Sequence, residues 1–174
     1  ETTVADGLDT SSLVKDYLED ARSHLDALDG ALLELEHGMG AGFDVELVNG
    51  LLGSLHTLKG NSGMMGFTTV QKFVHQLEGV FKRLLDNPAL LEQNLLDALF
   101  EGATILRNSV ETVGTNPQPD LSQETAFLES LAVASGGGAA GSGRPPDGTW
   151  AAHSGSAARG GRHARRSVAH LVHV

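Results

Sequence analysis

A histidine followed by a lysine and a run of glycines offers the clearest chemistry in this sequence. Residues 55–67 read LHTLKGNSGMMGF, in which His56 precedes Lys59 by three positions. A neutral imidazole nitrogen is a nucleophile near neutral pH, and a lysine ammonium suits a phosphoryl group, although it serves equally as an ordinary surface charge. Apolar residues enter this stretch at helical spacing, so we expect it to form a helix despite its glycines.

His56 is expected to stand on an open face of that helix. Counting by threes and fours gives a row with almost no side chains besides the histidine. The row consists of Asn49, Gly53, His56, Gly60 and Gly63. Each interior glycine costs about 0.5–1 kcal/mol relative to alanine, so the repetition suggests close approach of another protein to the imidazole. Gly66 falls off the row and is expected to help end the helix.

A polar row on the following helix could complete the site. The stretch HQLE places His75 and Glu78 three residues apart on one face, and Gln71 and Lys82 continue that row. If the two helices are antiparallel neighbours, this row can lie beside His56. A carboxylate that accepts a hydrogen bond from one ring nitrogen leaves the other free as a nucleophile, and Glu78 is the candidate for that role. An ordinary solvated helix face would explain the same residues.

The scaffold that positions these residues is predicted to be entirely helical. Apolar residues recur every three or four positions in four long stretches and a shorter fifth, the spacing of one buried stripe per helix. The stripes run through residues 13–35, 47–65, 70–84, 91–113 and 127–131. Short connections between long amphipathic helices favour an all-α, antiparallel up-down four-helix bundle, with the additional C-terminal helix packed outside it.

Composition divides the chain into three parts. We expect a disordered N-terminus over 1–9, a helical-bundle domain over 10–134, and a disordered Gly/Ala/Ser/Arg-rich tail or linker over 135–174. An out-of-frame translation product would read much like that tail, and a nucleic-acid-binding arm is a third interpretation. The first 134 residues hold seven Lys and Arg against 21 Asp and Glu, a net charge of −14, which argues against nucleic-acid binding by the bundle.

Several other classes of protein are disfavoured. The absence of cysteine excludes disulfides and thiolate zinc sites. No apolar run approaches the roughly 20 residues that span a bilayer, so we expect a cytoplasmic protein without membrane insertion. The glycines lack the preceding strand and the Gly-Lys-Ser/Thr ending of a phosphate-binding loop. Glu34 and His37 have the Glu-x-x-His spacing of di-iron bundles but no second copy, and His24 is interpreted as a solvated lone histidine.

Residues 56–67 resemble the phosphorylation motif of histidine-containing phosphotransfer (HPt) domains. The resemblance is closest to the domain at the N-terminus of the chemotaxis histidine kinase CheA, whose pattern runs His-x-hydrophobic-Lys-Gly-x-Ser/Ala-Gly/Arg-x-hydrophobic-Gly-Phe. The His-x-x-Glu of the following helix, here His75 and Glu78, also matches this type, as does the long opening helix. The resemblance covers about residues 10–134.

This resemblance implies a role for each residue of the constellation. His56 would be the phosphoacceptor, and Glu78 would hydrogen-bond the imidazole and orient it. Lys59 would lie near the phosphoryl group, and Gly60 would let the partner approach. His75 would have a supporting role. Residues 62, 63 and 66 would be structural.

The resemblance also implies partners. The phosphoryl donor would be ATP, bound with Mg²⁺ on a separate histidine kinase catalytic domain, and the acceptor an aspartate on a response-regulator receiver domain. No cofactor or metal would be bound by the HPt domain itself. The 174 residues contain no ATP-binding sequence of that kinase type, so we expect a substrate and relay, inactive alone, from a longer CheA-type kinase. The alternative is a helical adaptor that binds a partner through the glycine-lined face, with His56 incidental.

Overall fold

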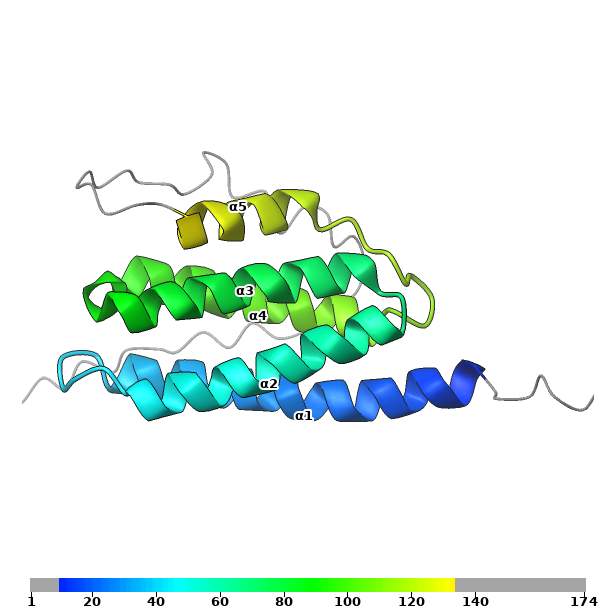
Figure 1. Ribbon diagram of the computed structural model, residues 1–174, viewed down its shortest axis with the longest axis horizontal. Coiled ribbons are helices and arrows are strands. Elements are labelled where there is room, and N and C mark those ends of the chain that lie inside the picture. Colours follow the sequence, from blue (N-terminus) through cyan, green and yellow to red (C-terminus); the bar gives the residue numbers. More distant parts are fainter. Residues whose placement is uncertain (1–9, 134–174) are drawn as a thin grey trace, which may run out of the picture. The chain divides into compact units, whose positions relative to one another are not determined.

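A computed structural model describes residues 10–133 as a succession of helices joined by short connections (Figure 1). Its elements are α1 (Thr10–His37), α2 (Val45–Met64), α3 (Thr68–Asp86), a 3-10 turn η1 (Pro88–Leu90), α4 (Gln93–Glu111) and α5 (Ser122–Val133). Between residues 10 and 133 there is no strand, and no helix is both long and apolar enough to cross a membrane. The disorder predicted for 1–9 and 135–174 lies outside the described residues.

The first four α-helices form the predicted antiparallel up-down bundle. Helix α1 packs against α2 and α4, and α3 packs against α2, α4 and the 3-10 turn. Helix α5 lies along the outer side of α3, as Figure 1 shows, so the prediction of an additional helix outside the bundle is confirmed. Helices α2 and α3 are joined by only three residues and therefore run side by side in opposite directions.

The predicted apolar stripes make up the core, with two corrections. Leu13 was expected in the first stripe but is 44% exposed, because α1 begins beyond the end of α2 and its first turn has no neighbour there (Figure 1). In the fourth stripe Leu96 is fully buried and Leu95 only partly, because both lie about one turn before Leu99 and the core takes in Leu96 more deeply. The other long stripes supply large buried side chains, among them Leu25, Leu28, Leu32, Leu55, Leu58, Phe73, Leu77, Leu84, Leu99 and Leu106.

The end of α2 is fixed by the glycine predicted to end it. Gly66 has a φ of +77°, the left-handed conformation that glycine adopts without penalty. Its N–H donates to Gly63 O at 3.1 Å, and the N–H of Phe67 donates to Ser62 O at 2.9 Å, which is the Schellman arrangement of a helix C-terminus. Phe67 then packs edge-on against Tyr17, whose hydroxyl lies 2.9 Å from Ser62 Oγ. This cap directs the chain into α3.

The start of α3 is capped by a residue 50 positions away. Gln118, in the connection between α4 and α5, accepts hydrogen bonds through Oε1 from the Thr68 hydroxyl at 2.9 Å and from the Thr69 N–H at 3.2 Å. Its amide nitrogen donates to Gly66 O at 2.5 Å. Because no local side chain caps α3, Gln118 satisfies donors that the helix start would otherwise leave to water. One side chain thus ties the α2–α3 turn to the segment that leads into α5.

Candidate functional site

His56 lies on the exposed side of α2, beside the seam with α3. Three quarters of its side chain (75%) is exposed, while its Nδ1 lies 3.3 Å from Oε1 of Glu78 on α3. The two polar rows predicted to meet across antiparallel helices therefore do meet. With Nδ1 turned to the carboxylate, Nε2 is the ring nitrogen that remains for reaction.

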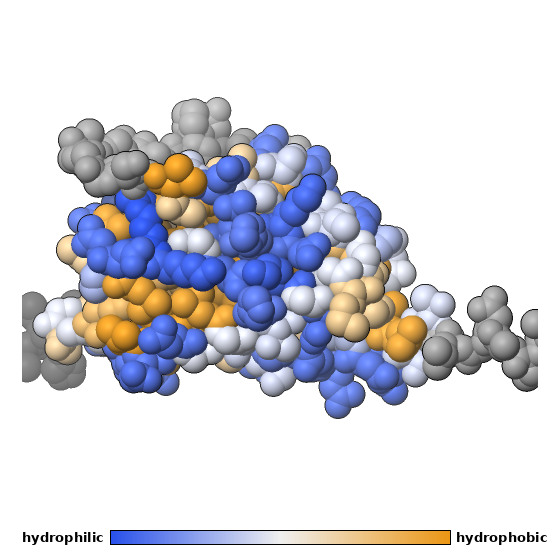
Figure 2. Space-filling view, in the orientation of Figure 1, coloured by the Kyte–Doolittle hydropathy of each residue, from blue (hydrophilic) through white to orange (hydrophobic). Residues whose placement is uncertain are grey.

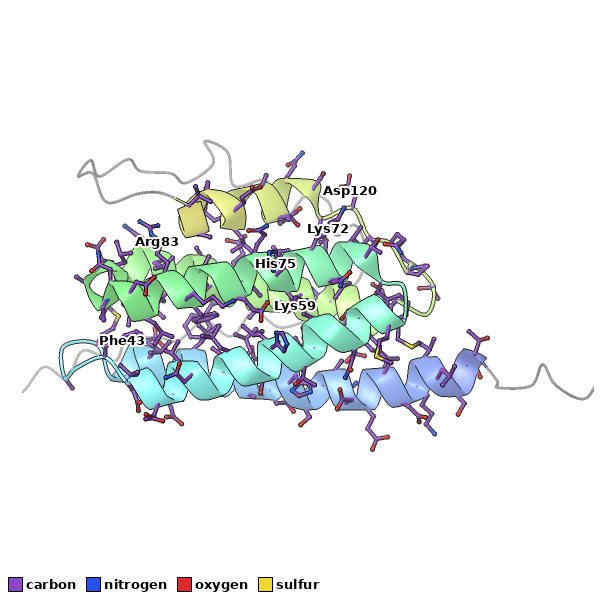
Figure 3. All side chains as sticks on the ribbon, in the orientation of Figure 1. Phe43, Lys59, Lys72, His75, Arg83 and Asp120 are labelled. Carbon is purple, nitrogen blue, oxygen red and sulfur yellow. The ribbon has the colours of Figure 1, made fainter. Side chains whose placement is uncertain are left out.

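Glu78 is a buried carboxylate with three basic neighbours. It is 2% exposed, and its Oε2 accepts a hydrogen bond from the Lys59 ammonium at 2.5 Å. The Nδ1 of His75 lies 3.8 Å from the same oxygen. A buried charge is costly unless it is paired, and Lys59, itself only 20% exposed, supplies that pairing. Figure 3 labels Lys59 and His75, which come from α2 and α3.

In this geometry the two oxygens of the Glu78 carboxylate face different partners. Oε1 faces the imidazole of His56 and Oε2 faces the lysine. The lysine supplies the pairing that a buried carboxylate requires, and Oε1 is left to face the imidazole. With the proton of a neutral imidazole on Nδ1, that N–H can donate a hydrogen bond to the carboxylate, and Nε2 keeps its lone pair.

The structure adds a contact of Lys59 that the motif resemblance did not imply. Lys59 was expected near the phosphoryl group, and its ammonium contacts Glu78, the acid beside His56. Helical spacing contained no sign of this contact, because a lysine side chain reaches either partner from the same helix position. The contribution of Lys59 to phosphoryl binding stays a prediction.

The glycines of α2 separate into two kinds. A Cβ added at Gly53 or Gly60 would meet nothing within 4 Å, and the same is true of Gly50, which the sequence row did not include. These three positions leave the outer face of α2 bare around His56. Gly63 is different, since a Cβ there would lie 2.5 Å from Nε2 of Gln71 on α3. Gly63 therefore faces the side chain of Gln71 instead of open space, and the structural role that the resemblance implied for it stays a prediction.

The remaining candidate residues lie apart from this constellation. Nε2 of His24 lies 3.3 Å from Asp20, which also accepts a hydrogen bond from Asn61 Nδ2 at 2.7 Å, so His24 is not the solvated lone histidine predicted. Glu34 and His37 occupy the last turn of α1. In the part of the chain that the structure describes, no three His, Asp or Glu side chains form a group able to hold a metal ion.

Curated relatives share part of this sequence. The chemotaxis protein CheA of Listeria monocytogenes is 32% identical over 124 residues, which are 70% of this chain and 20% of that protein. CheA of Bacillus subtilis is 28% identical over the same length, 18% of its own. The chain thus spans about a fifth of the length of these curated relatives.

A solved structure agrees with the fold. The phosphorylated P1 domain of CheA3, in complex with CheY6 from R. sphaeroides, matches with a TM-score of 0.56 and 25% identity, over 69% of this chain and 92% of that one. The model of the Hpt domain family matches residues 12–113, which include His56, Lys59, His75 and Glu78 and all of the first four helices except the first two residues of α1. With more than half of its length matched, the chain belongs to the Hpt domain family.

Proposed function

We propose that this chain is the histidine phosphotransfer module of a chemotaxis-type two-component system and that His56 carries the phosphoryl group. The observation that carries the proposal is the exposed imidazole of His56 with its Nδ1 3.3 Å from the buried carboxylate of Glu78. A surface histidine without a chemical role has no need of a buried carboxylate beside its ring. Here the contact of Glu78 with Nδ1 leaves Nε2, the reactive nitrogen, facing outward.

In the first step His56 receives the phosphoryl group. The lone pair of Nε2 attacks the γ-phosphorus of ATP held with Mg²⁺ on a separate kinase domain, and the bond from that phosphorus to the bridging oxygen breaks to release ADP. The proton on Nδ1 stays there and faces Glu78 Oε1, so the positive charge that develops on the ring lies against a carboxylate. The bundle contributes orientation and charge stabilisation, which suffices for a loose phosphoryl-transfer transition state.

In the second step the phosphohistidine gives up its phosphoryl group. A carboxylate oxygen of an aspartate on a receiver domain attacks the phosphorus, the bond to Nε2 breaks, and the electron pair returns to the ring nitrogen. His56 is then neutral again with its proton on Nδ1. Glu78 holds the same tautomer before and after the transfer, so the site is ready for another cycle without a proton exchange.

The neighbouring residues support both steps. Lys59 pairs with the buried Glu78 through its hydrogen bond to Oε2, and this is the part of its role that rests on a contact. His75, 65% exposed, lies beside the same oxygen and adds a second donor near it. Gly60 leaves open space one turn from His56, so either partner domain can bring its reacting atoms to Nε2.

In this scheme ATP and Mg²⁺ bind to the kinase domain, which also catalyses the transfer of the phosphoryl group. The chain acts as substrate and relay, in the cytoplasm where ATP is available to that kinase. Its relatives are about five times longer than the matched segment, so a kinase domain in the same polypeptide or in another one fits the proposal equally.

A labelling experiment tests the proposal. The purified chain is incubated with labelled ATP and the kinase core of a CheA relative, and acid-labile, base-stable phosphate on the chain is measured. We expect labelling of the wild-type chain and none of the His56→Gln variant, with His24→Gln as the matched control that labels normally. A His56→Gln variant labelled at the wild-type level overturns the assignment. Partner binding without any such phosphate favours the adaptor.

A further inference from the structure

The Glu78 carboxylate has a second imidazole beside it. Nδ1 of His75 lies 3.8 Å from Oε2 of Glu78, while Nδ1 of His56 lies 3.3 Å from Oε1. Both rings therefore turn the same nitrogen toward one buried acid, and Nε2 is the remote nitrogen in each. The side chain of His75 is 65% exposed, close to the 75% of His56. By position and exposure, His75 resembles the proposed phosphoacceptor.

The distance to Glu78 decides what the acid can do for His75. At 3.8 Å the contact is longer than a hydrogen bond, so the carboxylate acts on this ring through its charge. A ring phosphorylated on Nε2 keeps its proton on Nδ1 and is cationic, and a carboxylate near Nδ1 stabilises that cation. Lys59 takes the same oxygen at 2.5 Å and weakens the effect. We therefore expect His75 to react more slowly than His56.

Lys72 supplies a cation for a phosphoryl group on His75. It precedes His75 by three residues, so the two side chains are neighbours on one face of α3. Both residues are exposed, and Figure 3 labels both on this helix. On α2 the lysine at the same separation from His56 is Lys59, which is held by Glu78. An exposed ammonium one turn from the ring can pair with phosphate oxygens.

The surroundings of His75 suit a small anionic molecule. Figure 2 shows hydrophilic surface over the middle of α3. One turn after His75, a Cβ at Gly79 would lie 3.1 Å from the Cβ of Ala132, so α5 borders this part of α3. His56 instead stands on the bare outer face of α2. A protein domain therefore reaches His56 more easily than His75, whereas a small donor reaches both.

We propose that His75 is a second phosphorylation site, which takes a phosphoryl group from a small anionic donor without a kinase domain. The inference rests on the proposed function for the role given to Glu78. The lone pair of Nε2 attacks the phosphorus of the donor, and the bond from phosphorus to the leaving group breaks with its electron pair. With phosphoramidate, whose nitrogen is already protonated, the leaving group is ammonia. The proton on Nδ1 stays on the ring and faces the carboxylate.

Chemical phosphorylation of the full chain tests this inference. The wild-type chain and the His56→Gln variant are incubated with phosphoramidate, a small donor that needs no docking surface, and the labelled histidines are located by mass spectrometry of peptides. We expect label on His75 in both proteins, appearing more slowly than label on His56 in the wild-type chain. His37, an exposed histidine in the last turn of α1, is the internal reference. His75 should react at least about fivefold faster than His37.

Two substitutions separate activation from mere exposure. Glu78→Gln should bring the labelling rate of His75 down to that of His37, because the charge that stabilises the cationic ring is gone. Lys72→Gln should slow labelling of His75 by about threefold, whereas Lys72→Arg should keep most of the rate. Lys15→Gln, an equal change of charge at an exposed lysine of α1, is the matched control and should leave His75 unaffected.

The possible outcomes distinguish this inference from the proposed function. Labelling of His75 no faster than that of His37, or unaffected by both Glu78→Gln and Lys72→Gln, overturns the inference and leaves the role of His56 standing. Failure of phosphoramidate to label His56 in the wild-type chain would instead contradict the proposed function, whatever happens at His75.

Discussion

Lys59 lies closer to Glu78 than His56 does: its Nζ is 2.5 Å from Oε2, whereas Nδ1 of the histidine is 3.3 Å from Oε1. The carboxylate is therefore paired with the lysine ammonium, and its contact with the imidazole is the longer of the two. Pairing with Lys59 offsets the cost of burying the acid, and the second oxygen of Glu78 is left to orient His56.

Replacing Glu78 by glutamine should affect reactivity and stability in ways that can be separated. We expect labelling of His56 to slow by about tenfold or more, because the neutral amide no longer selects the tautomer with the proton on Nδ1. The free energy of unfolding should fall by about 1–3 kcal/mol, since Lys59 loses its partner while largely buried. Urea unfolding and the labelling rate measure the two effects.

The control for this variant is the double substitution Glu78→Gln with Lys59→Met. Removing both charges should recover most of the stability, because no buried charge is left unpaired. It should not recover the labelling rate. A double variant that labels as fast as the wild-type chain would show that Glu78 acts only through the fold.

Two alanine substitutions in the same stretch should have opposite effects on stability. Gly60→Ala should raise the free energy of unfolding by about 0.5–1 kcal/mol, since its Cβ meets nothing within 4 Å and alanine favours the helix. Gly66→Ala should lower it by about 1–2 kcal/mol, because φ is +77° there. Denaturant titrations of the two variants measure both, and equal signs would contradict the roles assigned to these glycines.

A large side chain at Gly60 should block partners but not small donors. We expect Gly60→Leu to accept a phosphoryl group from phosphoramidate normally and to exchange it with protein partners at least about tenfold more slowly, because the side chain projects into the space they need. Gly50→Leu lies on the same outer face of α2 but farther from His56, and serves as the control. Equal rates for the two variants with a protein partner would contradict the interpretation of the bare face.

Gln118 should contribute to stability without contributing to chemistry. Gln118→Ala removes the three hydrogen bonds that join it to Gly66, Thr68 and Thr69, and we expect a loss of about 0.5–2 kcal/mol, the range for a helix cap. Gln123→Ala, an exposed glutamine on α5, should be close to neutral. Labelling of His56 by phosphoramidate should be unchanged in both, and a slower rate in Gln118→Ala would show that the cap also positions the site.

Tyr17 should make the fold sensitive to alkali. Burial raises its pKa above the ordinary value of 10.0, so the folded state holds the phenol proton to higher pH than the unfolded state. The stabilisation is fully present below the unfolded pKa and is lost as the pH rises through the folded pKa. Because Tyr17 is the sole tyrosine of the chain, ultraviolet titration of phenolate formation reports its pKa directly.

Tyr17→Phe is the matched variant for this effect. It keeps the aromatic contact with Phe67, and the Ser62 hydroxyl still donates to Leu58 O at 2.7 Å. Its stability should fall less steeply than that of the wild-type chain above the tyrosine pKa. Parallel curves for the two proteins at alkaline pH would show that Tyr17 ionises as freely in the folded state as in the unfolded one.

The sequence predicted the helices and the meeting of His56 with Glu78, because helical periodicity fixes which residues share a face and short loops fix which faces adjoin. It did not predict the partner of Lys59, because that contact depends on how closely α2 and α3 approach, and one-dimensional spacing carries no such distance. Nor did it predict that Leu96 is fully buried and Leu95 only partly, since both lie about one turn before Leu99 and spacing alone does not choose between them.

Glu78 and Gly79 are adjacent on α3 but face different neighbouring helices. Glu78 reaches α2, while a Cβ at Gly79 would lie 3.1 Å from the Cβ of Ala132 on α5. A rotation of α3 about its axis that withdrew the carboxylate from His56 would also drive its backbone against α5 or away from it. Contact with α5 thus limits rotation of α3 about its own axis. Because α3 carries Glu78, this contact on the opposite side of α3 also helps to keep the His56 imidazole in its orientation.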